Sequence, residues 1–152
     1  MIFEIKDNDS NNISFKYISH IQKGTKKGIE QAFYKIGKDL KHTARRLILD
    51  EIKTGRLYKY NIGGKRIFHI SSAPGQSPAS VSGKLVDSID TNINGGSSME
   101  FGAGNSKLDY AKYLELGTIK MAKRPYLIRS INLNERNNYV SLQDKIEKEL
   151  SK

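Results

Sequence analysis

The fold of the N-terminal half follows from residues 25–55, TKKGIEQAFYKIGKDLKHTARRLILDEIKTG. Apolar residues recur through this stretch at spacings of three to five, which is close to the helical period. The pattern predicts one long amphipathic helix, with Thr25 as its N-cap and Gly55 as its C-terminal stop. The apolar stripe that this helix has to bury consists of Ile29, Phe33, Ile36, Leu40, Ala44, Leu47 and Ile52.

Positive charge is concentrated in the same third of the chain. The net charge is +10, and residues 20–70 hold thirteen Lys or Arg against four acids, a local excess of +9. Such a field attracts DNA or an acidic protein face, although a solvated helix surface has the same pattern. The cations that fall largely outside the apolar stripe, and form the predicted basic face, are Lys35, Lys38, Lys41, Arg45 and Arg46.

The remaining periodic segments predict strands and further helices. Alternation at period two indicates a first pair of strands within residues 2–5 and 13–17. A second pair, 89–93 and 98–101, flanks the turn Asn94-Gly95-Gly96. Short helices are expected over 84–88 and 110–116, and a final helix after Pro125, with an interruption in its polar middle at 132–138. This order predicts one α+β domain over 1–152, in which a long helix and a C-terminal helix pack on a small antiparallel sheet.

Residues 56–82 do not fit into that compact arrangement. Apolar residues on both sides of Gly63-Gly64 predict a β-hairpin, and a segment rich in Ser, Pro and Gly follows it. We expect a protruding hairpin and loop, because exposed apolar surface of this kind usually marks an interface. The predicted assembly interface consists of Tyr58, Tyr60, Ile62, Ile67 and Phe68.

No pattern in the chain indicates catalysis, a cofactor or a metal ion. The sequence has no Cys, and its three histidines, His20, His42 and His69, lack metal-ligand spacing. Neither a phosphate-binding GxxxxGK[ST] loop nor a GxSxG nucleophile turn occurs. We therefore expect a protein that is not an enzyme. No apolar stretch approaches a membrane span and no signal peptide is evident, so synthesis in the cytosol without a membrane partner is expected.

Five motifs follow one another along residues 25–131. The basic amphipathic helix precedes APGQSPA at 73–79, SGKLVDSI at 82–89, YAKYLELGT at 110–118 and RPYL at 124–127. Their order resembles the tail-component family of long-tailed phages typified by gene product ten of phage HK-97. Departures from that family's pattern are mild, such as Tyr126 where phenylalanine is usual. The motif positions are Gly83, Leu85, Ser88, Ile89, Tyr110, Ala111, Leu114, Glu115, Gly117, Thr118, Arg124 and Pro125.

The resemblance implies a structural protein of the virion. Its expected role is that of a tail-completion or tail-terminator subunit, which forms a ring, as a hexamer, where the tail joins the head. The ring would surround the DNA channel between a head-completion or connector protein and the tail tube, and non-specific contact with DNA is compatible with the charge. A head-completion protein, a minor tail protein or a non-specific DNA-binding module are the alternatives. The motif residues would be fold determinants, with Tyr110, Tyr113, Leu114 and Leu116 packing the short helix onto the sheet.

Overall fold

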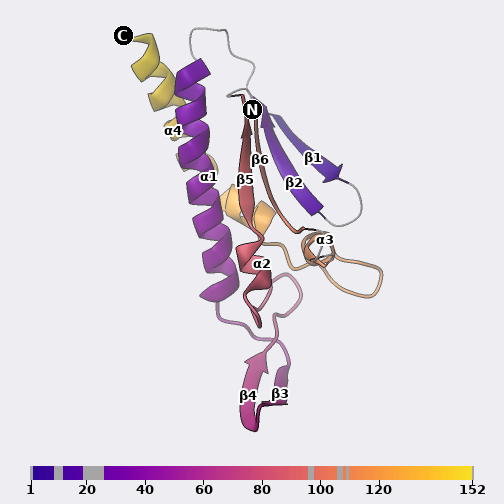
Figure 1. The fold of residues 1–152 in the computed structure, drawn as a ribbon. Helices are drawn as coiled ribbons and strands as arrows, with labels where there is room; N and C mark the ends of the chain where they lie inside the picture. Colours follow the sequence, from indigo (N-terminus) through magenta and orange to yellow (C-terminus); the bar gives the residue numbers. More distant parts are fainter. Residues whose placement is uncertain are drawn as a thin grey trace.

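The computed structural model describes residues 2–8, 12–18, 26–95, 98–105, 108 and 110–151, with side chains from residue 26 onward. Helices and antiparallel strands share one chain, so the predicted α+β class is confirmed (Figure 1). The predicted N-cap Thr25 and turn residue Gly96 lie outside the described residues. The elements are β1 (Ile2–Asn8), β2 (Asn12–Ile18), α1 (Lys26–Leu49), β3 (Leu57–Ile62), β4 (Lys65–Ile70), α2 (Lys84–Asp87), β5 (Asp90–Asn94), β6 (Ser98–Ala103), α3 (Ala111–Leu116) and α4 (Leu127–Leu150).

The main sheet combines two hairpins that are far apart in the sequence. Its strand order is β1-β2-β6-β5, and all of its pairs are antiparallel. Phe101 of β6 is the meeting point, since it pairs with Phe15 of β2 on one side and with Thr91 of β5 on the other. The β2–β6 pairing therefore joins the N-terminal hairpin to the body of the protein.

Helix α1 supplies the largest part of the core. Its buried face packs over β5 and β6, where Met99 and Phe101 are fully buried. The predicted stripe is wrong at its end, because the helix ends at Leu49 and Ile52 is 83% exposed. Ile48, four residues after Ala44 and on the same side of the helix, is buried instead. Gly55 is consequently not the helix stop and lies at the base of the next hairpin.

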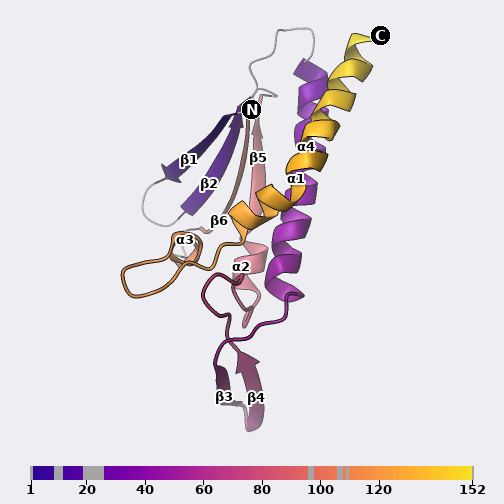
Figure 2. The same ribbon diagram turned by 180° about the vertical axis from the view of Figure 1, so that it is seen from behind.

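Helix α4 lies beside α1 and runs in the opposite direction (Figure 2). The predicted interruption at 132–138 is wrong, because α4 is continuous over its 24 residues. Asn134 and Asn138 are the buried polar residues of this segment, and the Nδ2 of Asn134 donates to Thr43 Oγ1 of α1 at 2.8 Å. Further along, Lys35 Nζ donates to Ser141 Oγ at 2.7 Å. Polar side chains of α4 thus form hydrogen bonds with α1 instead of interrupting the helix.

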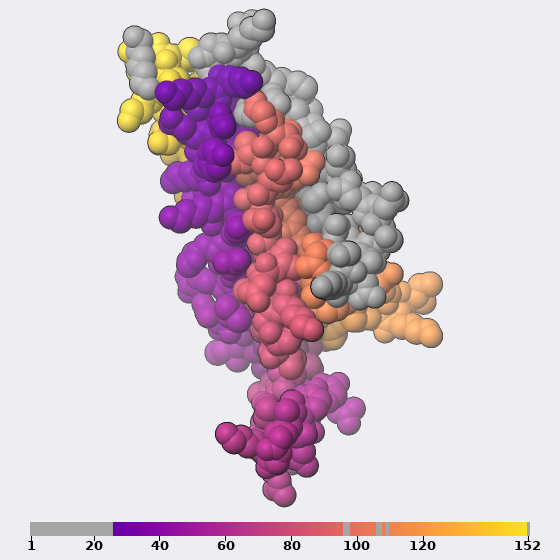
Figure 3. Space-filling model, viewed as in Figure 1, coloured from indigo at the N-terminus to yellow at the C-terminus, as the bar shows by residue number. Residues whose placement is uncertain are grey.

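Strands β3 and β4 form a separate two-stranded sheet that projects from one end of the body (Figures 1 and 3). We call residues 57–70 the arm. The predicted protrusion over 56–82 is too long, because only its hairpin half projects. In the half that follows, Ser72, Ser77 and Pro78 are buried against the body.

Candidate functional site: an assembly surface

A buried carboxylate joins α3 to the start of α4. Glu115 is 3% exposed, and its oxygens accept hydrogen bonds from the backbone N–H groups of Tyr126 (2.8 Å), Leu127 (3.0 Å) and Ile128 (2.9 Å). Burial raises the pKa of Glu115, and the three N–H donors oppose that rise. A negative charge here also complements the positive end of the α4 dipole. The YAKYLELGT and RPYL motifs therefore act together as one structural corner.

The exposed side of α3 differs from the prediction. Ala111 and Glu115, four residues apart, occupy its buried face. Leu114 packs partly buried against the core, as expected. Tyr110, Tyr113 and Leu116 are 41–50% exposed, so their predicted packing onto the sheet is wrong. The inward face is taken by the capping carboxylate, which turns the larger apolar side chains toward solvent.

Tyr126 buries a hydroxyl group with no hydrogen-bond partner. The side chain is fully buried, and within the described part of the chain its Oη finds no partner. Burial raises the pKa of Tyr126 well above its usual value, and the nearby Glu115 and Tyr110 add to the rise. An unpaired buried hydroxyl costs free energy because water no longer solvates it.

Replacing Tyr126 with phenylalanine should therefore not destabilise the protein. We expect the free energy of unfolding to stay equal or to rise by up to about 1 kcal/mol, since the ring remains and an unsatisfied polar atom is removed. Urea unfolding followed by circular dichroism measures this, with Tyr139→Phe at an exposed site as the control. A loss of more than about 1 kcal/mol would mean that the hydroxyl is hydrogen-bonded.

Gln76 of the APGQSPA motif ties both ends of the arm segment together. Its Oε1 accepts hydrogen bonds from the backbone N–H groups of Thr54 (3.0 Å) and Ala73 (2.9 Å). Its Nε2 donates to the carbonyl oxygen of Ile52 at 3.1 Å. One side chain thus bridges the chain that enters the arm and the chain that leaves it, which fixes the arm's base to the body.

A second cluster holds the same base between α1 and α4. Glu51 accepts hydrogen bonds from Ser77 N (2.9 Å) and Lys53 Nζ (3.0 Å), and it pairs with Arg129 Nη2 at 2.8 Å. Arg129 Nη1 also donates to Ser77 Oγ at 2.8 Å. Burial alone would raise the pKa of Glu51, but the hydrogen bonds from Arg129, Lys53 and Ser77 outweigh it and lower this pKa from 4.5 to about 2.

The Glu51 cluster should make stability depend on pH in the acid range. A folded pKa below the unfolded value contributes stability that is present above about pH 4.5 and is lost as the pH falls toward 2. We expect Glu51→Gln to cost about 1–3 kcal/mol at pH 7, allowing for partial solvent access, and progressively less below pH 4.5. Urea unfolding from pH 2 to 7 tests this, with exposed Glu135→Gln as the control. A cost independent of pH would contradict it.

The arm displays apolar side chains to solvent. Because successive residues of a strand point to opposite sides, Tyr58, Tyr60 and Ile62 share one side, and the pairing of Tyr60 with Ile67 adds the latter. All four are exposed, and the two tyrosine rings stack with centroids 6.2 Å apart. We call this side the tyrosine face. Phe68, the fifth predicted interface residue, is 61% exposed on the opposite side of the arm.

A two-stranded hairpin of this kind is marginally stable in water by itself. Most of its described side chains are exposed, and only His69 is half-buried. The arm also carries positive charge: residues 56–70 contain Arg56, Lys59, Lys65 and Arg66 and no acid. Exposed apolar area with a cationic border fits a surface that another molecule covers.

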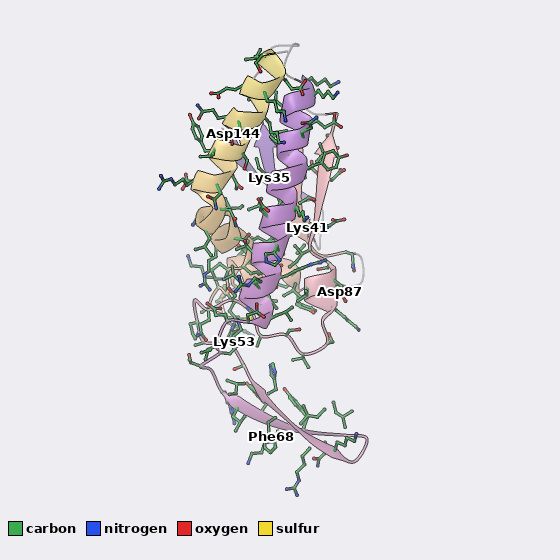
Figure 4. The ribbon with its side chains drawn as sticks, turned by 90° about the vertical axis from the view of Figure 1, so that its left-hand side faces the viewer. Lys35, Lys41, Lys53, Phe68, Asp87 and Asp144 are labelled. Carbon is green, nitrogen blue, oxygen red and sulfur yellow. The ribbon has the colours of Figure 1, made fainter. Side chains whose placement is uncertain are left out.

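The predicted basic face of α1 is divided between two neighbours. Lys41 Nζ forms an ion pair with Asp90 Oδ1 of β5 at 2.7 Å, and this hydrogen bond lowers the pKa of Asp90. Lys35 points the other way, to Ser141 of α4. Figure 4 shows Lys35 beside α4 and Lys41 on the side of α1 away from it. Both cations therefore serve contacts within the fold.

The other three cations of that face have different environments. Arg46 pairs with Asp50 one turn later at 3.1 Å. Lys38 and Arg45 lie, by helical spacing, on the outward ridge between the Lys35 and Lys41 sides. Lys38 is exposed and Arg45 is half-buried. The surface left for an acidic partner or DNA is thus narrower than the charge count predicted.

The SGKLVDSI motif forms the short helix α2 and the turn that leads into β5. Gly83 precedes α2 with φ 77°, a value that favours glycine. Leu85 and Ile89 are buried in the core. Ser88 Oγ donates to the Leu85 carbonyl oxygen at 2.8 Å and accepts from Gly104 N at 3.2 Å. These residues therefore stabilise the fold at this turn.

The last motif positions connect the corner to the arm's base. Arg124 Nε donates to the Ser72 carbonyl oxygen at 3.3 Å, and the Pro125 carbonyl oxygen accepts from Ser77 Oγ at 3.1 Å. Thr118 Oγ1 accepts from Met121 N at 3.1 Å, which closes the loop after α3. The motifs that were separate in the sequence therefore meet around one junction.

Comparison with family models, curated proteins and solved structures finds no match. Within the described ranges, no group of three His, Asp or Glu side chains could hold a metal ion. The helices among those residues include none with the length and apolar character of a membrane span.

Proposed function

We propose that this chain is a structural subunit of a tailed-phage particle, which forms a tail-completion or tail-terminator ring between tail and head. The observation that carries the proposal is the arm, a projecting hairpin whose apolar side chains are exposed, with no cover from the described residues. The ordered motifs add support, because their described residues cap, bury or brace the fold around the arm's base. Its neighbours would be copies of itself, a head-completion or connector protein and the tail tube.

A ring requires a heterologous interface, in which one surface of a subunit contacts a different surface of the next. The arm suits that task because the Gln76 and Glu51 hydrogen bonds attach its base to the body, while its two strands extend beyond it. The same arm would serve a head-completion or minor tail protein. The ring reading is preferred because a ring subunit is what the resemblance of the motif order implies.

Removing the arm tests the proposal. In the test variant, a short Gly-Ser linker replaces residues 57–70 and joins Arg56 to Ser71, whose backbones already meet through the Ser71 N to Arg56 O hydrogen bond of 2.9 Å. Analytical ultracentrifugation and electron microscopy should show rings of the natural chain and a folded monomer for the variant. A natural chain that stays monomeric at every concentration, or rings that persist without the arm, would contradict it.

A non-specific DNA-binding module is the second candidate. Its support is the stacked pair Tyr58 and Tyr60, with the Arg56 guanidinium 5.6 Å from the centre of the Tyr58 ring, since cations and aromatic rings together suit a nucleic-acid backbone. This reading predicts that the monomer binds duplex DNA with an affinity that falls steeply as salt rises. Fluorescence anisotropy with a labelled duplex distinguishes the two functions.

A further inference from the structure

A second exposed apolar surface lies on α4. Tyr139, Leu142, Ile146 and Leu150 follow one another at spacings of three and four, which places them along one side of the helix. Tyr139 and Leu150 are 66% and 67% exposed, whereas Leu142 and Ile146 are half-buried against the core. The first three line a shallow hollow of about 290 Å³. We call these four residues the α4 stripe.

Acidic residues border the α4 stripe. Glu147 lines the hollow itself, and helical spacing places Glu135 and Glu149 next to the stripe. Arg136 and Lys145 are the cations that the same spacing brings to this side of α4, so three acids face two cations there. Lys148 falls on the opposite side of the helix. The stripe is thus an apolar surface with a border of net negative charge.

The arm has the complementary character at the other end of the molecule. The arm contains Lys59, Lys65 and Arg66 and no acid, and Arg56 precedes it. Lys65 lies on the side of the tyrosine face, and Arg56 lies over the Tyr58 ring, whereas Lys59 and Arg66 lie on the opposite side with Phe68. In Figure 4, Phe68 of the arm and Asp144 of α4 lie at opposite ends of the molecule. An arm that keeps this orientation therefore cannot cover the α4 stripe of its own chain. The dimensions also agree, because eleven residues of helix rise about 16 Å and a six-residue strand spans about 20 Å.

We propose that the arm of one copy seats its tyrosine face on the α4 stripe of a second copy. The inference rests on the proposed ring function and specifies its interface. Tyr60 and Ile62 cover Tyr139 and the hollow beside it, and Arg56 and Lys65, the cations on the side of the tyrosine face, lie against the acidic border. Each chain offers one arm and one stripe, so the contact is head-to-tail and repeats until the ring closes.

Two double variants test this interface without disturbing the core. The arm variant is Tyr60→Ser with Ile62→Ser, and the stripe variant is Tyr139→Ser with Leu150→Ser; all four side chains are exposed. We expect each variant to be monomeric at concentrations at least tenfold above those at which the natural chain assembles. Matched controls are Phe68→Ser on the opposite side of the arm and Leu133→Ser on the opposite side of α4, both exposed and expected to assemble normally.

Mixing the two variants gives the decisive result. The stripe variant keeps an intact arm and the arm variant keeps an intact stripe, so an equimolar mixture should form heterodimers and nothing larger, as measured by ultracentrifugation. A mixture without dimers, or a stripe variant that assembles like the natural chain, overturns the inference while the ring function stands. A natural chain that remains monomeric overturns the ring function as well.

Cross-linking gives an independent measurement, because the chain contains no cysteine. Ile62→Cys in one preparation and Tyr139→Cys in another should join through a short bismaleimide into a covalent dimer. Leu133→Cys in place of Tyr139→Cys should reduce the yield at least tenfold. Equal yields from the two positions would contradict the assigned contact.

Discussion

Replacing Glu115 with alanine should lower the free energy of unfolding by about 3–5 kcal/mol, because buried backbone donors lose their acceptor. Glu115 alone accepts from three successive N–H groups at the start of α4. Two of those donors, on Tyr126 and Leu127, belong to fully buried residues that water cannot reach easily. The loss should unfold the corner that orients α4 against α1.

Urea unfolding measures this effect. Glu115→Gln should fall between the natural chain and Glu115→Ala, since an amide oxygen accepts but the adjacent NH₂ group faces donors. The matched control is Glu135→Ala, an exposed position within α4, with an expected change below about 0.5 kcal/mol. A cost of Glu115→Ala below about 1 kcal/mol would show that the α4 N-terminus finds other acceptors.

Gly117→Ala should cost about 3–4 kcal/mol, the second large effect, through backbone strain and a close contact together. Gly117 has φ 79° and ψ 178°, a region that is almost restricted to glycine. A Cβ atom here would lie 2.9 Å from Lys123 N and 3.0 Å from Met121 O, both of them backbone atoms. Neither neighbour can move without disturbing the loop that leads to α4.

A glycine in open space separates the two contributions. Gly95 also has a positive φ, of 58°, but beyond its chain neighbours no atom of the described residues lies within 4 Å of a Cβ placed there. Gly95→Ala should therefore cost only the conformational part, about 1–2 kcal/mol. Equal losses for the two variants, measured by thermal or urea unfolding, would mean that the contact with the Lys123 backbone does not matter.

The sequence predicted the elements whose signal is local. The apolar spacing of α1, the alternation in the strands and the Gly63-Gly64 turn each depend on residues close together in the chain. The predictions are wrong where a residue's environment depends on a partner that is distant in the sequence. The middle of α4 was expected to break the helix because it is polar. The local sequence does not show that Asn134 has a hydrogen-bond partner, Thr43, on another helix.

The corner around α3 failed for a related reason. A glutamate between leucines is usually exposed, and nothing in its neighbourhood signals that Glu115 meets N–H groups eleven or more residues later. Once the carboxylate is buried, Tyr113 and Leu116 have to face solvent.

The proposed assembly surface was predicted in part. The arm's apolar residues were identified from their positions beside the turn, but their division between two sides required the strand register. The sequence did not indicate that the arm's base is held by hydrogen bonds of Glu51, Gln76 and Ser77, since polar residues in loops are common. The residues of the α4 stripe indicated the final helix, but the exposure of Tyr139 and Leu150 depends on how α4 packs against α1.

Contacts at the base of the arm link the stability of the fold to the proposed assembly. The Gln76 and Glu51 contacts attach the arm where α1 ends and α4 begins, so the corner that Glu115 holds also sets the arm's direction. Variants of the corner should therefore reduce assembly through unfolding, whereas variants of the tyrosine face should reduce assembly in a folded chain. Measuring stability and assembly together separates these two routes.

Electron cryomicroscopy of phage particles purified from a host lysate in which this chain is expressed tests the central claim most directly. We expect a ring of copies around the DNA channel at the junction of head and tail, with each arm resting on the next copy. The chain's absence from the particle, or its location at the distal end of the tail, would contradict the assignment.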